Sequence, residues 1–330
     1  MSHTPIRIGL IGAGGIADAH ISHLQRLGAE VYVYSLDGAE ELVAQFGGTV
    51  VHSIEELFDL VTIVDICSPT FTHFELAKKA LEAGKNVICE KPLTRHDDEA
   101  VELSRLAAAN GLTILPAHVV RFFPEYAELA AAVHAGQLGE LAVLRLSRSG
   151  AFPNRSPWFG DRRLSGGIIM DQMIHDIDIA RWLAGPVAQI SAISTTVGDE
   201  TEPAETAHVL LRHESGAISQ ISGVWGPPHT TFTTEYSVTG TLGRLEHHSG
   251  KQQNFVANLQ IDESGGGLIP AVDPLANPYF LELREFLEAL TDGSSARVDC
   301  EDGVEAVRLA NAALQSLETG QPVTLSKAGV

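Results

Sequence analysis

Positively charged residues are scarce in this sequence, which has 22 Lys and Arg against 42 Asp and Glu and a formal net charge of −20. A surface this acidic repels phosphate backbones and anionic lipids, so nucleic acids and membrane surfaces are disfavoured as partners. The chain also lacks an apolar run of about 18 residues, which a membrane-spanning helix needs. Its opening, Met1 to Pro5, is too short and too polar for a signal peptide. These absences predict a cytoplasmic protein.

Cysteine is also rare, since the chain contains only Cys67, Cys89 and Cys300. The count is odd, and no two of these residues have the C-x-x-C spacing of a zinc or redox motif. Cys67 and Cys89 lie in apolar, strand-like runs. We therefore expect buried free thiols in a reducing compartment rather than a disulfide or a zinc site.

The length of 330 residues predicts two domains. In the first third, short β-rich runs alternate with longer amphipathic segments, a pattern typical of a parallel sheet with helical crossovers. The expected strands are Ile6–Ile11, Val31–Tyr34, Ile63–Cys67, Asn86–Cys89 and Thr113–Leu115. The expected helices are Ala17–Leu27, Ala39–Phe46, Ile54–Asp59, Phe74–Ala83 and Asp97–Ala109.

After about residue 120, β-rich runs follow one another directly with turn signals between them, which indicates a largely antiparallel sheet. The expected strands are Ala142–Arg148, Gln189–Val197, Thr206–His213, Ala217–Val224, Thr233–Thr239 and Gly243–His247. Helical periodicity returns at Tyr279–Leu290 and Asp302–Glu318, after an expected surface loop over Gly265–Pro278. The predicted fold is α/β, with a doubly wound parallel sheet in residues 1–120 and an α+β domain with a mostly antiparallel sheet in residues 121–330.

A glycine turn follows the first expected strand and opens the first helix, in the run "IRIGLIGAGGIADAH". Gly12 permits a tight turn, Gly14 lets the backbone approach a pyrophosphate, and Ala17 allows close packing of helix on strand. The helix N-terminus offers unpaired N–H groups to the phosphates. The residues expected to line this dinucleotide site are Gly12, Gly14, Gly15, Ile16 and Ala17.

The adenosine ribose of a dinucleotide is held by an acidic residue about 20 residues further on, at the end of the second strand. Asp37 has that spacing from Ala17, but the strand is expected to end near Ser35, so Asp37 lies just beyond it. Ser35 could accommodate a 2′-phosphate, yet no Lys or Arg between Leu27 and Lys78 is available to pair with one. We therefore expect NAD, with NADP as the alternative.

Glu90-Lys91-Pro92 directly follows the expected strand Asn86–Cys89, at the edge of a parallel sheet where ligands gather. Lys91 could hydrogen-bond a substrate hydroxyl, and a neighbouring cationic nicotinamide ring could lower its pKa. A surface lysine in a strand-to-helix loop is the alternative interpretation.

Asp171 and His175 are four residues apart in "GGIIMDQMIHDIDIARWLAG", so on a helix both side chains project from one face. The pair suits a histidine general base that a carboxylate orients. The alternatives are a helix N-cap by Asp171 with a structural His175, and a metal site. A metal site needs at least three ligands, and only two share the face, so we expect no metal.

Arg121 lies in the run "HVVRFFP" at the expected domain junction. Its guanidinium could anchor the C-terminal domain or contact an oxygen atom of a substrate.

These motifs together resemble the Gfo/Idh/MocA oxidoreductases. The glycine turn, "CSPTFTHFELAKKALEAGKNVICEKPL" and "GGIIMDQMIHDIDIARWLAG" carry the resemblance, and "GVEAVRLANAALQSLETGQPVTL" extends it to the carboxyl end. Within the family, Met173 to Asp176 followed by Asp178 and Arg181 is similar to inositol dehydrogenases.

The resemblance implies a Rossmann domain and a second domain whose open sheet often mediates homo-oligomerisation, here as a dimer or tetramer. It also implies that Lys91 is the catalytic lysine and that Asp171 and His175 are its partners. The residues implied beside the cofactor are Ser68, Pro69, Thr70 and His73, with Glu90 close to its ribose. Family members usually place an acidic residue at the end of the second strand, where this chain has Ser35-Leu36.

The implied substrates are small molecules, namely polyols, pyranoses and related cyclic sugars. The segment Phe152 to Arg163, with Arg155, Trp158 and Asp161, is expected to cover the substrate. The leading hypothesis is oxidation of a secondary hydroxyl with hydride transfer to nicotinamide C4. The alternatives are a hydrolase or lyase that uses NAD for transient oxidation, and a non-catalytic NAD-dependent sensor.

Overall fold

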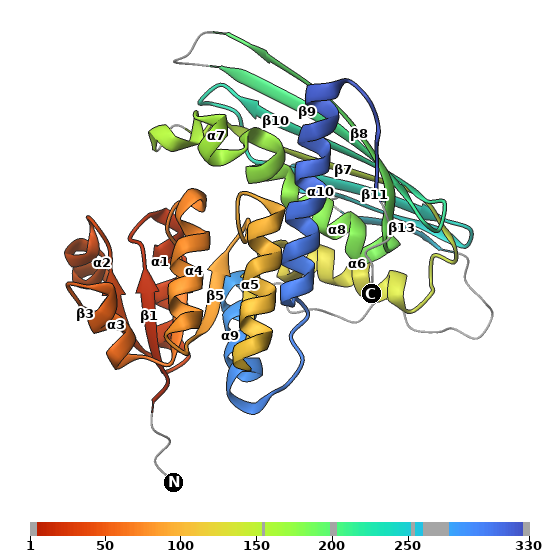
Figure 1. Cartoon of the computed structure of the whole chain (residues 1–330). Helices are drawn as coiled ribbons and strands as arrows, with labels where there is room; N and C mark the ends of the chain where they lie inside the picture. The colour runs from red at the N-terminus through yellow and green to blue at the C-terminus, as the bar shows by residue number, and fades with distance from the viewer. Residues whose placement is uncertain (1–4, 154–155, 199–202, 252–254, 260–276, 326–330) are drawn as a thin grey trace. The chain divides into compact units, whose positions relative to one another are not determined.

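The structure is a computed structural model of the chain and describes residues 5–153, 156–198, 203–251, 255–259 and 277–325. Contacts divide the chain into two units (Figure 1). The first comprises Met1–Phe123 and Leu275–Val307, and the second comprises Pro124–Pro274 and Arg308–Val330. Each unit has a sheet of its own.

The first unit is built on a six-stranded parallel sheet with the strand order β3-β2-β1-β4-β5-β6. The strands are β1 (Arg7–Ile11), β2 (Glu30–Tyr34), β3 (Thr49–Val50), β4 (Ile63–Ile66), β5 (Asn86–Glu90) and β6 (Ile114–Ala117). β1 pairs with β2 on one side and with β4 on the other, so the direction of winding reverses there. Doubly wound sheets bind their ligands at the carboxyl ends of strands beside such a switch point.

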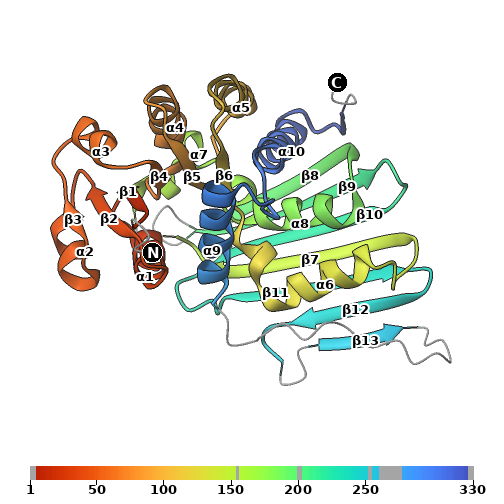
Figure 2. The same ribbon diagram turned by 90° about the horizontal axis from the view of Figure 1, so that it is seen from below.

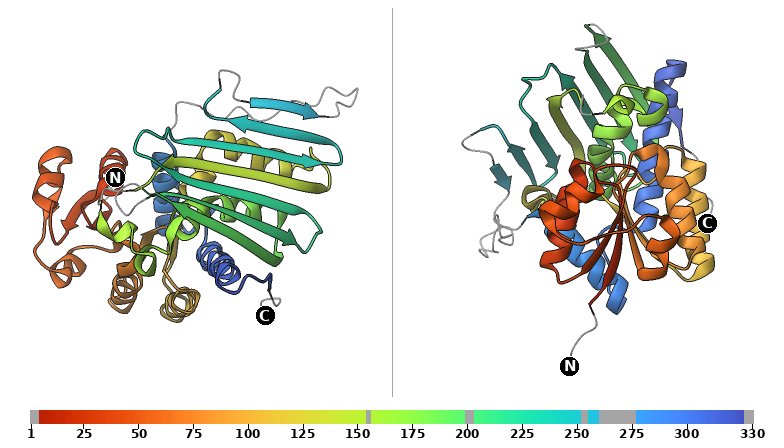
Figure 3. Two further views of the ribbon diagram at one scale, coloured as in Figure 1. Left: turned by 90° about the horizontal axis from the view of Figure 1, so that it is seen from above. Right: turned by 90° about the vertical axis from the view of Figure 1, so that its left-hand side faces the viewer.

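Helices lie on both faces of this sheet (Figure 3). They are α1 (Gly15–Arg26), α2 (Ala39–Phe46), α3 (Ile54–Leu60), η1 (Thr70–Thr72), α4 (His73–Glu82), α5 (Asp97–Asn110), η2 (Val119–Phe122) and α9 (Pro278–Asp292). α1 buries Ala17, Ile21 and Leu24, whose spacing of three and four residues places them on one face. α9 packs against α1 and adds Leu283 and Phe286 to the same apolar core.

The second unit is built on an eight-stranded sheet with the order β13-β12-β11-β7-β10-β9-β8-β14. The strands are β7 (Leu141–Ala151), β8 (Val187–Val197), β9 (Ala204–His213), β10 (Ile218–Gly226), β11 (Thr233–Gly240), β12 (Gly243–His248), β13 (Phe255–Leu259) and β14 (Val323–Thr324). β10 runs parallel to β7, and the other neighbouring pairs are antiparallel. Buried and exposed residues alternate along β9, as expected for a sheet with one covered face.

Helices α6 (Pro124–His134) and α8 (Ile174–Ala184) lie over one face of this sheet (Figure 2). Between β7 and α8 the chain forms η3 (Pro157–Phe159), α7 (Arg162–Ser165) and the π-helix η4 (Ile169–Met173). Helix α10 (Cys300–Thr319) begins in the first unit and continues in the second. No helix of the described residues covers the opposite face of the sheet, where Ile193 is 70% exposed and Leu210 is 48% exposed (Figure 3).

The predicted fold class is confirmed, with both sheets of the expected kind. The elements that were not predicted are mostly short, namely β3, α6, α7, β13, β14 and the 3-10 helices η1, η2 and η3. The sequence predicts one change of domain near residue 120, whereas Leu275–Val307 groups with the first unit. Helical periodicity predicts α9 but does not reveal which sheet a helix packs against. The expected loop Gly265–Pro278 lies, up to residue 276, outside the described residues.

Cys67 and Cys89 are buried free thiols, as predicted. Among the described helices, none combines the length and the apolar character that crossing a bilayer requires.

Candidate active site

The turn after β1 requires glycine at position 12. Gly12 has a φ of 108°, in the left-handed region that favours glycine, and its N–H donates to the Tyr34 carbonyl oxygen at 2.9 Å. A Cβ here would lie 2.8 Å from the carbonyl carbon of Cys67 and 2.9 Å from the backbone nitrogen of Ser68. Any larger residue would therefore force the turn away from the segment that follows β4.

The N-terminus of α1 is open. Gly14 and Gly15 are exposed, Ile16 is half-buried, and Ala17 is buried against the sheet. A Cβ on Gly14 would meet no described heavy atom within 4 Å outside its chain neighbours. Gly14 is the N-cap, and no side chain caps the N–H groups of the first turn. Exposed donors at the positive end of a helix dipole fit the pyrophosphate of a dinucleotide.

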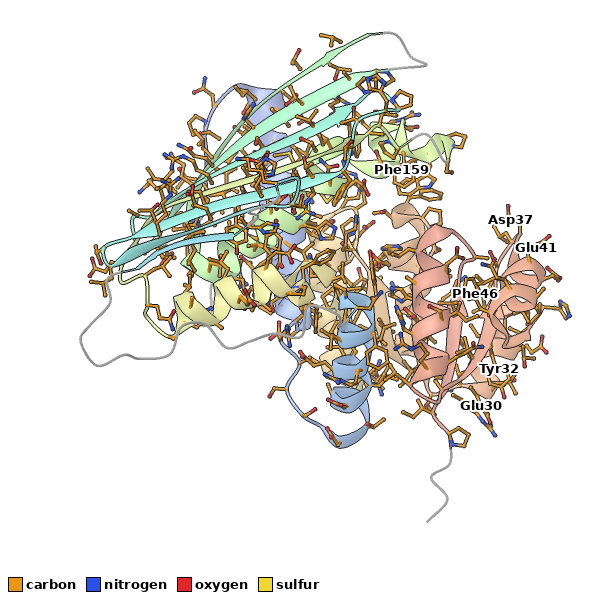
Figure 4. All side chains as sticks on the ribbon, turned by 180° about the vertical axis from the view of Figure 1, so that it is seen from behind. Glu30, Tyr32, Asp37, Glu41, Phe46 and Phe159 are labelled. Carbon is orange, nitrogen blue, oxygen red and sulfur yellow. The ribbon has the colours of Figure 1, made fainter. Side chains whose placement is uncertain are left out.

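The segment after β2 carries the candidate ribose-binding residues. Ser35 follows the strand directly and is half-buried, whereas Asp37 is exposed. Glu40 and Glu41 lie in the first turn of α2. Figure 4 shows the side chains of Asp37 and Glu41 beyond one end of β2, with Glu30 at the other end. Carboxylates therefore gather at the carboxyl end of β2, where a second phosphate on the ribose would be repelled.

His73 connects the segments that follow β4 and β5. Its side chain is buried, and its two ring nitrogens lie 2.8 Å from the carbonyl oxygens of Pro92 and Ser68. Burial lowers the pKa of His73, and the hydrogen bonds to these carbonyl oxygens oppose the shift only in part. Thr70 is also buried, while Ser68 and Pro69 are half-buried. His73 thus holds the backbone of the predicted cofactor-binding segment in place. Its ring is buried and does not face the cofactor directly.

Glu90 and Lys91 lie at the carboxyl end of β5. Glu90 is 6% exposed, and its Oε2 accepts the backbone N–H of Lys91 at 2.9 Å. Burial raises the pKa of Glu90, but the hydrogen bond and charge of His20 and the charge of Lys91 outweigh it, so the pKa lies below its ordinary value. Glu90 is therefore ionised at neutral pH. The Lys91 side chain is half-buried.

In the second unit, Asp171 lies in the π-helix η4 and His175 lies in the first turn of α8. Between Ser165 and Ala180, these are the two side chains that are not buried. The sequence predicts one α-helix through both positions, whereas the structure inserts a π-turn, a feature that is frequent at functional sites. The N-caps of η4 and α8 are Ile168 and Met173, so Asp171 is not the helix cap of the alternative interpretation.

A buried ion pair holds α8 against the sheet. The Nε and Nη2 atoms of Arg148 in β7 donate to the two carboxylate oxygens of Asp176, each at 3.0 Å. The Nε2 of Gln172 donates to the Arg148 carbonyl oxygen at 3.0 Å. Burial alone would lower the pKa of Arg148. Asp176 and Tyr126 raise the pKa by more than burial lowers it, so the guanidinium keeps its charge. The helix that presents His175 is thus fixed on its buried side by a bidentate contact.

The segment expected to cover the substrate is described in part, and Arg155 lies outside the described residues. Trp158 and Phe159 stack with ring centroids 3.9 Å apart in η3. The Asp161 carboxylate accepts the backbone N–H of Arg163 at 2.9 Å and so caps α7. Arg162 lies 3.0 Å from the carboxylate of Glu205. Asp161 therefore has a local structural role, whereas Trp158 offers an aromatic surface.

Arg121 is the residue for which the sequence left two roles open. Its side chain is 1% exposed, and Nη1 donates to the Arg297 carbonyl oxygen at 2.7 Å and to the Asp302 carboxylate at 2.9 Å. All three residues belong to the first unit. The expected contact of Arg121 with a substrate oxygen is therefore wrong. A guanidinium this buried, with these bonds to Arg297 and Asp302, anchors the segment Leu275–Val307.

One group among the described residues has the spacing of metal ligands, since the ligand atoms of His20, Asp65 and Cys67 lie within 4.8 Å of one another. These atoms already bond one another. His20 Nδ1 donates to Asp65 at 2.8 Å, and Cys67 Sγ lies 3.8 Å from the other Asp65 oxygen. Burial raises the pKa of the Cys67 thiol, with a further contribution from Asp65, and metals bind the thiolate. We assign this group to hydrogen bonding rather than to a metal.

Sequence reasoning missed His20, Asp65 and Glu282, three polar residues with no exposed surface. Two signals were available. His20 is three residues after Ala17, on the face of α1 that packs against the sheet, and Asp65 interrupts the apolar run "IVDIC". A charged residue in a buried strand requires a partner. The identity of that partner depends on tertiary contacts that no local pattern contains.

Comparison with known proteins matches both parts of the chain to domains of one family. Residues 6–118 match the model for the oxidoreductase family with an NAD-binding Rossmann fold, and residues 126–246 match the model for the GFO/IDH/MocA C-terminal domain. The chain is 29% identical to the myo-inositol 2-dehydrogenase of Thermotoga maritima, over 98% of this chain and 99% of that protein. It is also 29% identical to the 1,5-anhydro-D-fructose reductase of Ensifer adhaerens, over 96% and 97%.

Among solved structures, a myo-inositol dehydrogenase from Corynebacterium glutamicum superposes with a TM-score of 0.78 at 25% identity, over 98% of this chain and 100% of that one. The order of the two matched regions is the order of the two sheets described above. The chain therefore belongs to the GFO/IDH/MocA family of oxidoreductases.

Proposed function

We propose that this oxidoreductase interconverts a secondary hydroxyl and a ketone on a sugar, cyclitol or related polyol. The observation that carries the proposal is that Asp171 and His175 are half-buried in a stretch from Ser165 to Ala180 that is otherwise buried. Polar side chains that keep some exposed surface on an otherwise buried, rigid helix are suited to contact a substrate. His175 takes the hydroxyl proton during oxidation, and Asp171 orients its ring.

Lys91 is the second proton-handling group of the proposal. Its backbone N–H is held by the buried Glu90 carboxylate, so the position of its Cα is fixed while its side chain remains half-buried. A lysine ammonium donates hydrogen bonds to a substrate oxygen and stabilises negative charge that develops on it. When bound, the nicotinamide accepts a hydride from the carbon that bears the hydroxyl or returns one to it.

The cofactor favoured by the proposal is NAD, with NADP as the weaker alternative. The residues that would hold it are the open N-terminus of α1 and the segment after β2. Asp37, Glu40 and Glu41 are acidic, and no Lys or Arg occurs between Leu27 and Lys78. A 2′-phosphate would thus meet negative charge without a pairing partner, whereas the 2′-hydroxyl of NAD can donate to a carboxylate.

The proposed substrate class is supported by the named relatives and by the aromatic side chains of η3 in the second unit. The relatives carry the names myo-inositol 2-dehydrogenase and 1,5-anhydro-D-fructose reductase. The stacked Trp158 and Phe159 offer the kind of aromatic face on which sugar rings pack, and Arg155 would add hydrogen-bond donors. The open face of the second sheet is the surface we assign to homo-oligomerisation.

A panel of cyclitols, aldoses and anhydrosugars with NAD and with NADP tests the proposal through the absorbance of reduced nicotinamide. We expect net reduction of NAD with at least one member, at a higher kcat/KM than with NADP. Release of product from a glycoside without net reduction would contradict the proposal in favour of a hydrolase or lyase. Dinucleotide binding without turnover of any member would contradict it in favour of a sensor.

A further inference from the structure

A cluster of buried polar side chains is hydrogen-bonded to the backbone of Lys91 in the first unit. His20 in α1 has no exposed surface, and its two ring nitrogens reach two carboxylates. Nδ1 lies 2.8 Å from Asp65 Oδ2 in β4, and Nε2 lies 3.3 Å from Glu90 Oε1 in β5. The other oxygen of Glu90 accepts the Lys91 N–H. A continuous chain of hydrogen bonds therefore runs from Asp65 to the backbone of Lys91.

The chemistry of this cluster requires a charged His20. Ionised carboxylates only accept hydrogen bonds, so each ring nitrogen must carry a proton to bond Asp65 and Glu90 at once. Burial alone lowers the pKa of His20, but the charge of Asp65 and its hydrogen bond overcome this and raise the pKa well above its ordinary value of 6.5. An imidazolium between two carboxylates holds both in fixed positions.

We propose that His20 is a positioning residue for Lys91 and acts through Glu90. This inference rests on the proposed function, since Lys91 is the proton-handling group it serves. The imidazolium holds Glu90 Oε1, which leaves Oε2 aimed at the Lys91 N–H and fixes the start of the lysine side chain. A neutral His20 can donate to one carboxylate only. The shorter contact to Asp65 is then retained, and the longer contact to Glu90 is lost.

The charged groups around His20 determine the pH at which its ring becomes neutral and the contact to Glu90 is lost. Titratable and aromatic side chains face the cluster from every element packed against it. They are Asp65 from β4, Cys67 directly after it, Cys89 and Glu90 from β5, Lys91 after that strand, and Tyr279, Glu282 and Glu285 from α9. Both oxygens of Glu282 are buried without a hydrogen-bond partner in the described structure, and burial raises its pKa. A neutral Glu282 adds no charge, so the charge and hydrogen bond of Asp65, which raise the pKa of His20, chiefly determine when the ring loses its proton.

The test compares His20→Gln, Glu90→Gln and their double variant with His23→Gln. His23 is a matched control because it lies on the same helix, is 8% exposed and bonds Arg26 instead of the cluster. Turnover is measured against pH, together with the dissociation constant of NAD. The backbone amide resonance of Lys91 and the ring nitrogen shifts of His20 are measured by NMR, and neither readout requires a substrate.

We expect His20→Gln and Glu90→Gln each to lower kcat by about tenfold or more, with the double variant no worse than either single one, because both act through one contact. In Glu90→Gln the alkaline fall in turnover should move to lower pH, whereas in His20→Gln, which has no ring to titrate, the part of the fall caused by the ring should be absent. The NAD dissociation constant of His20→Gln should change less than about threefold, a difference of under 1 kcal/mol. The Lys91 amide should shift in these variants and stay in place in His23→Gln.

A neutral His20 ring at pH 7, or a folded His20→Gln variant with an unmoved Lys91 amide, would overturn the inference. So would losses in kcat that add in the double variant. If the wild-type protein reduces no NAD with any polyol, the proposed function fails on its own, and the two NMR readouts still decide whether His20 positions Lys91. Should His20→Gln fail to fold, the wild-type ring shifts and the Glu90→Gln amide spectrum decide it.

Discussion

Arg148 in β7 and Asp176 in α8 form a bidentate ion pair with both contacts at 3.0 Å, and neither side chain is exposed by more than 4%. The residue before Asp176 is His175, which is half-buried and lies outside this contact. The ion pair therefore fixes α8 from its buried side while the candidate general base remains accessible. Asp176 thus stabilises the position of α8, and the adjacent His175 is the residue that α8 presents to the candidate site.

Replacing Arg148 alone should be costly. In Arg148→Met the Asp176 carboxylate loses its partner in a buried site, which destabilises a protein by about 3–5 kcal/mol. The double variant Arg148→Met/Asp176→Leu should recover most of this loss, because no charge is left unpaired. The free energy of unfolding from urea titration is the measurement. Arg145→Met is the control, since Arg145 is exposed on the same strand and bonds Gln220. A cost in the single variant no larger than in that control would contradict the prediction.

The two glycines of the first turn should respond differently to alanine. Gly12→Ala places a Cβ at a positive φ and against the Cys67 backbone, so it should destabilise the fold by more than about 1 kcal/mol. Gly14 has no such contacts, so Gly14→Ala should leave stability within about 0.5 kcal/mol of wild type. Its methyl group would instead occupy the proposed pyrophosphate site and weaken NAD binding about tenfold, or about 1.4 kcal/mol.

Calorimetric titration of NAD and thermal unfolding separate these two effects. A Gly14→Ala variant that binds NAD as tightly as wild type would exclude the N-terminus of α1 as the phosphate site.

Glu282 should make stability fall as the pH rises. Burial, followed by the charge of Glu90, raises the pKa of Glu282 well above its ordinary value of 4.5. Above that value the unfolded chain releases the proton while the folded chain keeps it. Stability is therefore lost at about 1.4 kcal/mol per pH unit until the pKa of the folded state is reached. Glu282→Gln removes this loss, since its amide does not ionise.

Urea titrations at about pH 5, pH 6 and pH 7 test this sign. The stability of Glu282→Gln relative to wild type should increase with pH, whereas Glu288→Gln, an exposed change on the same helix, should show no trend. A relative stability that is independent of pH would show that Glu282 ionises normally in the folded protein.

Much of the fold could be predicted from the sequence because its signals are local. The strand and helix periods predicted both sheets, and the spacing of Gly12, Gly14 and Ala17 predicted the turn that opens α1. The return of Leu275–Val307 to the first unit could not be predicted, since the partner of an amphipathic helix is a tertiary choice.

The candidate site divides in the same way. Asp171 and His175 were singled out by residue type and spacing, whereas Lys91 was chosen through the resemblance to the family. Asp171 and His175 keep some exposed surface in a buried stretch. The π-turn at Asp171 and the cluster of His20, Asp65 and Glu90 were not predicted. The cluster depends on contacts between residues far apart in the chain, such as the 45 positions that separate His20 from Asp65.

The central claim is that Lys91 and His175 handle the substrate proton. The most direct measurement is kcat of Lys91→Ala and of His175→Ala on a polyol that the wild-type protein oxidises, with the NAD dissociation constant measured alongside. Since a positioned acid–base group contributes about 10²–10⁴-fold, each variant should lose turnover by that order while NAD binding stays nearly unchanged. Wild-type turnover in both variants, with the proteins folded and NAD bound, would contradict the account.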